Sequence, residues 1–122
     1  MRLQESGEMY LETIYLLSRN NPRVRAIDVG QEMGYSKPSV SRAVGLLKDG
    51  GFITVDKDGC LHLTEEGLEV AERTYERHTV LTGFFKAIGI PEEVAEEDAC
   101  RIEHCISDTT LDALKKLYES LA

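Results

Sequence analysis

The sequence predicts a mainly helical protein that contains one short β-hairpin. Apolar residues recur at helical spacing over most of the chain, and glycine, proline or serine residues mark the ends of these segments. Residues 52–63 differ, because β-favouring residues lie on both sides of a turn that contains Gly59. No apolar run approaches the ~18–20 residues that a membrane span requires, so we expect no membrane partner.

Two helices are expected near the start of the chain. Residues 6–20 place Tyr10, Ile14 and Leu17 on one stripe, which is typical of an amphipathic helix, and the sequence NNP then breaks the pattern. Residues 28–34 predict a short helix that ends at a glycine, because glycine readily adopts the left-handed conformation of a helix C-cap.

A third helix follows at once and leads into the hairpin. Ser36 is a suitable N-cap, Pro38 suits the first turn, and the glycine pair at 50–51 ends the segment. Two helices joined by a tight, glycine-containing turn and followed directly by a hairpin are typical of a winged helix-turn-helix. A lone two-stranded hairpin is marginally stable, so we expect it to pack on the helices.

The second half of the chain predicts helices only. A long helix is expected from Thr64 to about Ile88, and Pro91 opens another that we expect to continue through about Ile106. Ser107 caps a last helix. The predicted fold class is therefore mainly α, with a winged helix-turn-helix DNA-binding domain followed by an all-helical domain.

The charge is distributed unevenly. Residues 1–63 carry eight basic and eight acidic side chains, whereas residues 64–122 carry six basic and fourteen acidic ones, which accounts for the whole net charge of −8. If either half contacts a polyanion, we expect the first, where residues 20–48 carry five basic and two acidic side chains. The acidic total excludes an indiscriminately basic protein.

The cysteine content favours a reducing compartment. Three cysteines with uneven spacing do not form a disulfide framework, and the N-terminal sequence lacks the apolar stretch of a signal peptide. We therefore expect a cytoplasmic protein whose thiols are reduced and able to act as ligands.

Short polar and basic side chains occupy the N-terminal end of the predicted recognition helix, the end that enters the major groove. We predict DNA contacts from Ser36, Lys37, Pro38, Ser39, Ser41 and Arg42. Arg42 suits a guanine edge or a phosphate, and the sequence leaves both open. The alternative is a pair of helices with a solvated polar face. The β-hairpin that follows the two helices argues against this alternative.

The segment DACRIEHCIS contains a candidate metal-binding group. Cys100, Glu103 and His104 stand at positions i, i+3 and i+4, so a helix places them on one face. A thiolate, a carboxylate and an imidazole suit a divalent transition ion, but three ligands leave it under-coordinated. Spacing alone equally fits an ordinary helix face on which Cys100 is a small core residue.

Further ligands are few. Met9 and Glu12 share a face of the first helix, and His78 lies midway along the long helix. Taken singly, Met9 fits the core better than a metal site, and His78 fits a partly buried structural histidine.

The chain resembles the diphtheria toxin repressor and manganese transport regulator family of metal-dependent transcriptional repressors. Four segments carry the likeness, in the family's order and spacing: SGEMYLETIYLL, DVGQEMGYSKPSVSRAVGLLKDGGFI, LTEEGLEVAERTYERH and DACRIEHCIS. The resemblance implies a winged-helix domain over residues 1–71 and a helical metal-binding and dimerisation domain over 72–122. Iron-type members carry a third, SH3-like domain, so the chain ending at Ala122 is expected to be a short, two-domain form.

The resemblance also implies a metal site. The family's ligand positions fall on Met9, Glu12, His78, Cys100, Glu103 and His104. The implied cofactor is Fe²⁺ or Mn²⁺, with Co²⁺, Ni²⁺ or Zn²⁺ as possible substitutes, and the implied partners are double-stranded operator DNA and a second copy of the chain. The implied role is control of metal-homeostasis genes, with the ion joining the first helix to the dimerisation domain.

Individual positions bear on the choice of ion. The residues at Met9 and Cys100 resemble those of the iron-responsive branch, and Glu12 resembles a ligand of the manganese-responsive branch. Sulfur ligands favour ions softer than Mn²⁺. At the family's ancillary site, the iron branch has His and Glu where this chain has Glu96 and Thr82, so Glu96 is only a possible ancillary ligand.

Two rival functions remain. A thiol enzyme would use Cys100 as nucleophile and His104 as base, but no glycine-rich loop or strained turn accompanies the pair, so we expect no enzyme. The second rival function is that of a metal-independent winged-helix module, which binds DNA or another protein. Metal analysis of protein purified without chelator separates it from a metal sensor.

Overall fold

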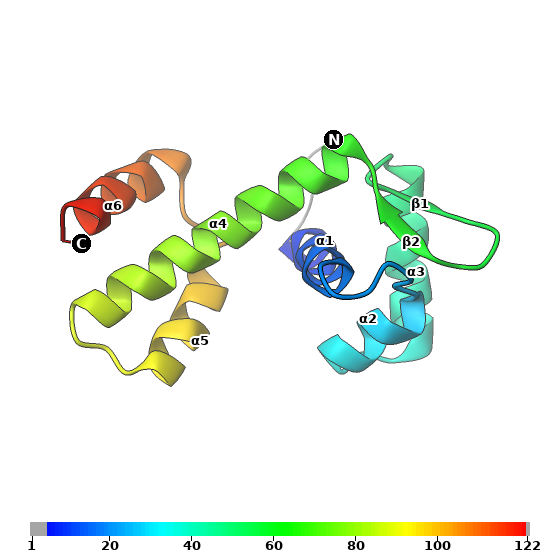
Figure 1. Ribbon diagram of the computed structural model, residues 1–122, viewed down its shortest axis with the longest axis horizontal. Coiled ribbons are helices and arrows are strands. Elements are labelled where there is room, and N and C mark those ends of the chain that lie inside the picture. Colours follow the sequence, from blue (N-terminus) through cyan, green and yellow to red (C-terminus); the bar gives the residue numbers. More distant parts are fainter. Residues whose placement is uncertain (1–4, 122) are drawn as a thin grey trace. The chain divides into compact units, whose positions relative to one another are not determined.

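The computed structural model describes residues 5–121 and is mainly helical (Figure 1). The elements follow one another as α1 (Glu5–Ser18), α2 (Ala26–Met33), α3 (Lys37–Asp49), β1 (Ile53–Val55), β2 (Leu61–Leu63), α4 (Glu65–Ala87), α5 (Glu92–Ile102) and α6 (Asp108–Leu121). The chain forms two compact units, one ending at Glu72 and one beginning at Arg73. The predicted fold class is confirmed. Within residues 5–121, no helix combines the length and apolar character needed to cross a membrane.

The turn between α2 and α3 is built from the residues that the sequence indicated. Gly34 has φ 71°, and its N–H donates to Gly30 O at 2.9 Å, which ends α2 in the left-handed conformation. The hydroxyl of Ser36 accepts from the N–H of Ser39 and caps α3. A side-chain carbon at Gly30 would stand 3.2 Å from Val40, so the missing side chain allows α2 and α3 to pack closely.

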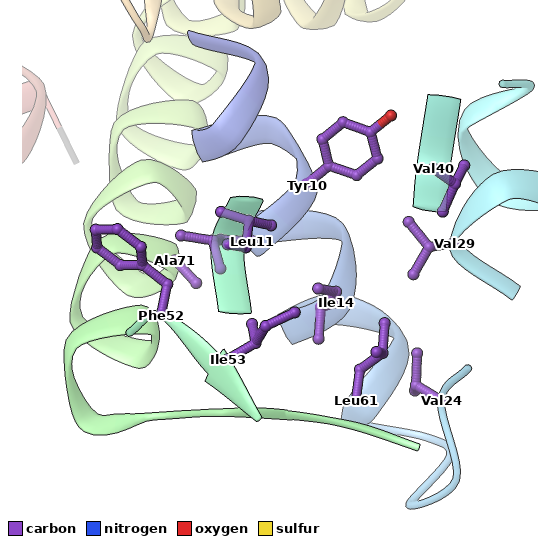
Figure 2. Close-up of a cluster of buried hydrophobic side chains, with 11 residues drawn as sticks. Tyr10, Leu11, Ile14, Val24, Val29, Val40, Phe52, Ile53, Leu61 and Ala71 are labelled. Atoms are coloured by element: carbon purple, nitrogen blue, oxygen red, sulfur yellow. The ribbon is translucent and has the colours of Figure 1, made fainter. Parts of the chain in front are cut away.

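A single apolar core holds the first unit together (Figure 2). Helix α1 contributes Tyr10, Leu11 and Ile14, which point from one face of the helix toward side chains of the other elements. The remaining buried members are Val24, Val29, Val40, Leu47, Phe52, Ile53, Leu61 and Ala71. Since this core includes residues from α1, both helices of the helix-turn-helix, both strands and the start of α4, it fixes the orientation of α3.

The hairpin packs on that core. Strands β1 and β2 are antiparallel and pair Ile53 with Leu63 and Val55 with Leu61, and the intervening turn uses Gly59 at φ 82°. The N–H of Leu61 donates to the carbonyl of Val24 at 2.7 Å, which ties β2 to the segment before α2. The predicted wing is therefore an integral part of the first unit.

The second unit contains the remainder of α4, then α5 and α6. Its core is formed by Val80, Leu81, Ala99 and Leu111. The Ser107 hydroxyl accepts from the Thr110 N–H at 3.2 Å, so the predicted cap of the last helix is confirmed.

One predicted boundary is wrong. We expected the helix after Pro91 to continue through about Ile106, but α5 ends at Ile102 and residues 103–105 form a turn. The guanidinium of Arg77 donates to the carbonyls of Glu103 and Ile106, at 3.0 and 2.9 Å. A long-range contact thus satisfies carbonyls of this turn, and local sequence gives no sign of it.

Candidate DNA-binding face and metal centre

The N-terminal turns of α3 form an exposed polar surface. The predicted DNA-contacting residues Ser36, Lys37, Pro38, Ser39, Ser41 and Arg42 are all exposed. Val40, among them in sequence, is 2% exposed and anchors the helix in the core. The hydroxyls of Ser36 and Ser39 lie 2.9 Å apart, so the cap itself belongs to this surface. Polar side chains outward and an apolar anchor inward are what a recognition helix requires.

Exposed apolar side chains flank this surface. Ile27 and Tyr35 line a groove of about 330 Å³ between α2 and α3, next to Lys37 and Ser41. Ile27 is 62% exposed and Tyr35 is 46% exposed, and the Tyr35 ring packs against that of Tyr10 at a centroid distance of 5.9 Å. Exposed apolar groups beside a polar helix end are suited to the methyl group of thymine. Such positions are hard to find from sequence, because the apolar pattern alone assigns them to the core.

A buried carboxylate lies between two imidazoles in the second unit. Glu103, in the turn after α5, is 1% exposed. Its Oε2 accepts a hydrogen bond from Nδ1 of His78 in α4, at 2.8 Å. Its Oε1 lies 3.2 Å from Nε2 of His104, whose side chain is also fully buried. Three of the six predicted ligands are therefore brought together.

The environment of Glu103 keeps its carboxylate charged. Burial acts to raise the pKa of Glu103, but the contacts with the imidazoles of His104 and His78 lower it more, so the pKa lies below its usual range. Within residues 5–121, Oε1 of Glu103 is buried and accepts no hydrogen bond of good geometry. A buried anionic oxygen beside two imidazoles fits a divalent transition ion in donor chemistry.

The remaining predicted ligands are placed as follows. Cys100 is exposed in the last turn of α5. Met9 and Glu12 lie three residues apart on α1, each half-buried, in the first unit. Glu96, the possible ancillary ligand, is exposed on α5. Glu103 contacts both imidazoles, but within the described chain no three His, Cys, Asp or Glu side chains are arranged so that they could together hold a metal ion.

The elements and side chains described above define a class of protein, the winged-helix DNA-binding proteins that carry a second, helical unit. Comparison with known proteins identifies the family. Residues 2–61 match the family model "Iron dependent repressor, N-terminal DNA binding domain", and residues 64–122 match "Iron dependent repressor, metal binding and dimerisation domain".

Individual relatives agree. The chain is 33% identical over 106 residues to the transcriptional regulator MntR of Escherichia coli O157:H7, covering 87% of this chain and 68% of that protein. It is 32% identical to the diphtheria toxin repressor of Corynebacterium jeikeium, covering 98% of this chain and 50% of the relative. The crystal structure of the metal-dependent transcriptional regulator MtsR superposes with a TM-score of 0.86 at 27% identity, over 93% of this chain and 53% of that chain.

The chain therefore belongs to the iron-dependent repressor family of metal-dependent transcriptional regulators. The resemblance inferred from four sequence segments is confirmed. The chain spans only about half the length of some of these relatives.

Proposed function

We propose that this protein is a metal-dependent repressor that binds operator DNA as a homodimer when Fe²⁺ or Mn²⁺ is available. It acts in the cytoplasm, has no enzymatic activity, and controls genes of metal homeostasis. The observation that carries the proposal is the Glu103 carboxylate, which is buried with the imidazoles of His78 and His104 in a chain whose other unit exposes a polar recognition helix.

We assign the two roles to the two halves of the chain. Residues 1–71 contact double-stranded DNA through Ser36, Lys37, Pro38, Ser39, Ser41 and Arg42. Residues 72–122 form the metal-binding and dimerisation domain. This division is supported by the charge distribution, because the acidic second half is poorly suited to a polyanion.

The proposed metal ligands are Met9, Glu12, His78, Cys100, Glu103 and His104. The sulfur atoms of Met9 and Cys100 favour Fe²⁺ over Mn²⁺, whereas the carboxylates of Glu12 and Glu103 suit either ion. Co²⁺, Ni²⁺ and Zn²⁺ are expected to substitute, because imidazole and thiolate ligands accept all three. Glu96, which is exposed on α5, is at most an ancillary ligand.

These residues explain regulation through linkage. A bound divalent ion supplies positive charge that the carboxylates and imidazoles share. By sequence, the ligand set draws on both halves of the chain, so metal binding and DNA binding influence one another. The ion favours the DNA-binding conformation only by its difference in affinity between conformations.

Operator binding in the presence and absence of metal tests this function. Fluorescence anisotropy is measured anaerobically with Fe²⁺, Mn²⁺ or Zn²⁺, and with EDTA, for the wild type and the Glu103→Gln variant. We expect metal to raise the operator affinity of the wild type by roughly 5–150-fold, the range of common allosteric couplings. The operator affinity of Glu103→Gln should be the same with metal and with EDTA. Glu97→Gln, an exposed carboxylate on α5, is the matched control and should respond like the wild type.

The alternative function makes a different prediction. A metal-independent winged-helix module would bind the same DNA equally well with metal and with EDTA. Equal affinities would therefore reject the sensor function while retaining the DNA-binding face.

A further inference from the structure

The guanidinium of Arg77 holds the turn that follows α5. Its Nη1 donates to the carbonyls of Glu103 and Ile106, and its Nη2 donates to the carboxylate of Asp108 at the start of α6. The Arg77 side chain is 13% exposed. One side chain of α4 thereby connects the end of α5 to the beginning of α6, across 26 to 31 residues of sequence.

The contact with Glu103 suits the chemistry of a helix end, because Glu103 is the C-cap residue of α5. The last carbonyls of a helix have no partners within the helix and carry partial negative charge, which a cation stabilises. An arginine is better suited than a lysine here, because its planar fork of N–H groups reaches several acceptors in fixed directions. The carbonyl of Glu103 is therefore fixed in place by a partly buried, charge-assisted hydrogen bond.

Arg77 and His78 together hold Glu103 at two points. Arg77 binds the backbone carbonyl of Glu103, and the next residue, His78, binds its carboxylate. Arg77 and His78 are consecutive residues of α4, so one segment of this helix supplies both contacts. With the carbonyl and the carboxylate both fixed from α4, the position of Glu103 and the direction of its side chain are determined.

We propose that Arg77 is a positioning residue of the metal centre, which fixes the 103–106 turn so that Glu103 and His104 are held in place for the ion. This inference rests on the proposed role of Glu103 and His104 as ligands. Residues that orient the ligands of a metal commonly affect its affinity by about 10–100-fold when replaced. Arg77 differs from such partners in acting through the backbone.

A purely structural role is the competing explanation, because Arg77 also connects α4 to α6. Another ion pair provides a control for that role. Lys115 of α6 and Glu76 of α4 form an ion pair at 2.7 Å. This ion pair does not involve the 103–106 turn. Lys115→Met therefore removes a connection between α4 and α6 whose α4 residue, Glu76, directly precedes Arg77. The substitution should leave the 103–106 turn intact.

The experiment compares Arg77→Gln, Lys115→Met and Glu103→Gln with the wild type, all as the full chain. Co²⁺ affinity and the visible absorption of bound Co²⁺ are measured anaerobically, and the thermal midpoint is measured without metal. Hydrogen exchange of the Cys105 and Ile106 amides, which donate to the carbonyl of Ile102, reports on the turn in the metal-free protein.

We expect Arg77→Gln to bind Co²⁺ about 10–100-fold more weakly, with an altered absorption spectrum and faster exchange of both amides. Lys115→Met should keep the affinity, the spectrum and the exchange rates of the wild type. Affinity within twofold of the wild type for Arg77→Gln would overturn the inference. Equal losses in Arg77→Gln and Lys115→Met would overturn it too, because they would indicate a general effect of stability.

Two further variants keep the test decisive. If Arg77→Gln does not fold, Arg77→Lys retains the charge but not the fork, and its affinity should lie between the wild type and Glu103→Gln. Wild-type affinity in Arg77→Lys would then reject the inference. If Glu103→Gln itself binds Co²⁺ as tightly as the wild type, the ligand assignment fails, a result distinct from a failure of Arg77 alone.

Discussion

Gly67 occupies a position at which a side chain cannot be accommodated. It lies in the first turn of α4, and a carbon atom added to its Cα would stand 2.0 Å from the carbonyl oxygen of Phe52. Because the obstacle is backbone, Gly67→Ala should displace the start of β1 or of α4. We expect a loss of about 1–3 kcal/mol in the free energy of unfolding, the usual effect of overpacking, measured by urea denaturation.

Gly45 is the matched control for this prediction. It lies in α3, and an added carbon meets nothing within 4 Å. Gly45→Ala should therefore stabilise the protein by about 0.4–1 kcal/mol, because alanine restricts the unfolded chain and favours a helix. Equal destabilisation by both substitutions would show that the contact with Phe52 is not the cause.

At the level of elements, the wing is stabilised by one carboxylate. Asp56 accepts hydrogen bonds from the N–H groups of Asp58 and Cys60 through Oδ1, and its Oδ2 contacts Nε2 of His62, all at 2.9 Å. The hydrogen bond with His62, followed by that of the Cys60 N–H, lowers the pKa of Asp56 below its usual value. The turn is thus stabilised by the ionised form of the carboxyl.

This arrangement predicts how the wing responds to pH. Since the pKa of Asp56 is lower in the folded state, its contribution to stability is complete above the unfolded value of about 3.9 and is lost as the pH falls through the folded value. The amides of Asp58 and Cys60 should therefore remain protected from hydrogen exchange near neutral pH and lose protection on acidification below about pH 4.

Substitution supplies the control for the wing. Asp56→Ala should abolish protection of the Asp58 and Cys60 amides at every pH, whereas Asp58→Ala should retain it, because Asp58 enters this network through its N–H. Protection that persists in Asp56→Ala would contradict the role of the carboxylate.

The packing of α4 on α6 depends on a second glycine. An added carbon at Gly83 would stand 2.5 Å from the Tyr118 hydroxyl and 2.6 Å from the ring carbon that bears it. Gly83→Ala should therefore displace Tyr118 and lower the thermal midpoint. In a double-mutant cycle with Tyr118→Ala, the combined loss should be smaller than the sum of the single losses, because the smaller residue removes the clash. Strict additivity would contradict this contact.

The elements that the sequence predicted well are those with local signals. Gly34 and Ser36 mark the turn of the helix-turn-helix by themselves, since one adopts positive φ and the other caps a helix with its own hydroxyl. The end of α5 has no such signal, because Arg77, 26 residues earlier, binds the carbonyl of Glu103. A prediction from helical periodicity alone therefore extended the helix too far.

The candidate metal centre was predictable to the same extent. The spacing of Cys100, Glu103 and His104 indicated which residue types lie in the last turn of α5 and in the turn that follows it. Spacing does not indicate that Glu103 is buried and paired with His78, because that contact joins residues 25 apart and depends on how α4 packs against the turn. Nor does it indicate that Cys100 is exposed.

At the scale of the whole molecule, charge and linkage act together. Residues 1–63 are neutral in sum and residues 64–122 carry the net −8, so we expect operator affinity to depend on local basic groups, with Lys37 and Arg42 as the proposed contacts. A divalent cation bound at the proposed ligands would reduce the net negative charge of the chain. This long-range effect is screened at physiological salt, where the Debye length is about 8 Å, so specific linkage must supply most of the coupling.

Linkage makes a strict quantitative prediction. If metal raises operator affinity by a given factor, saturating operator must raise metal affinity by the same factor, because the two paths to the ternary complex have equal free energy. Both affinities are measured at one salt concentration, with Mn²⁺ and with Fe²⁺, and at protein concentrations above dimer dissociation. Non-operator DNA of equal length should give a smaller factor, and Glu103→Gln should give a factor near one. Unequal factors in the two directions would mean that metal changes the assembly of the protein rather than its affinity for DNA.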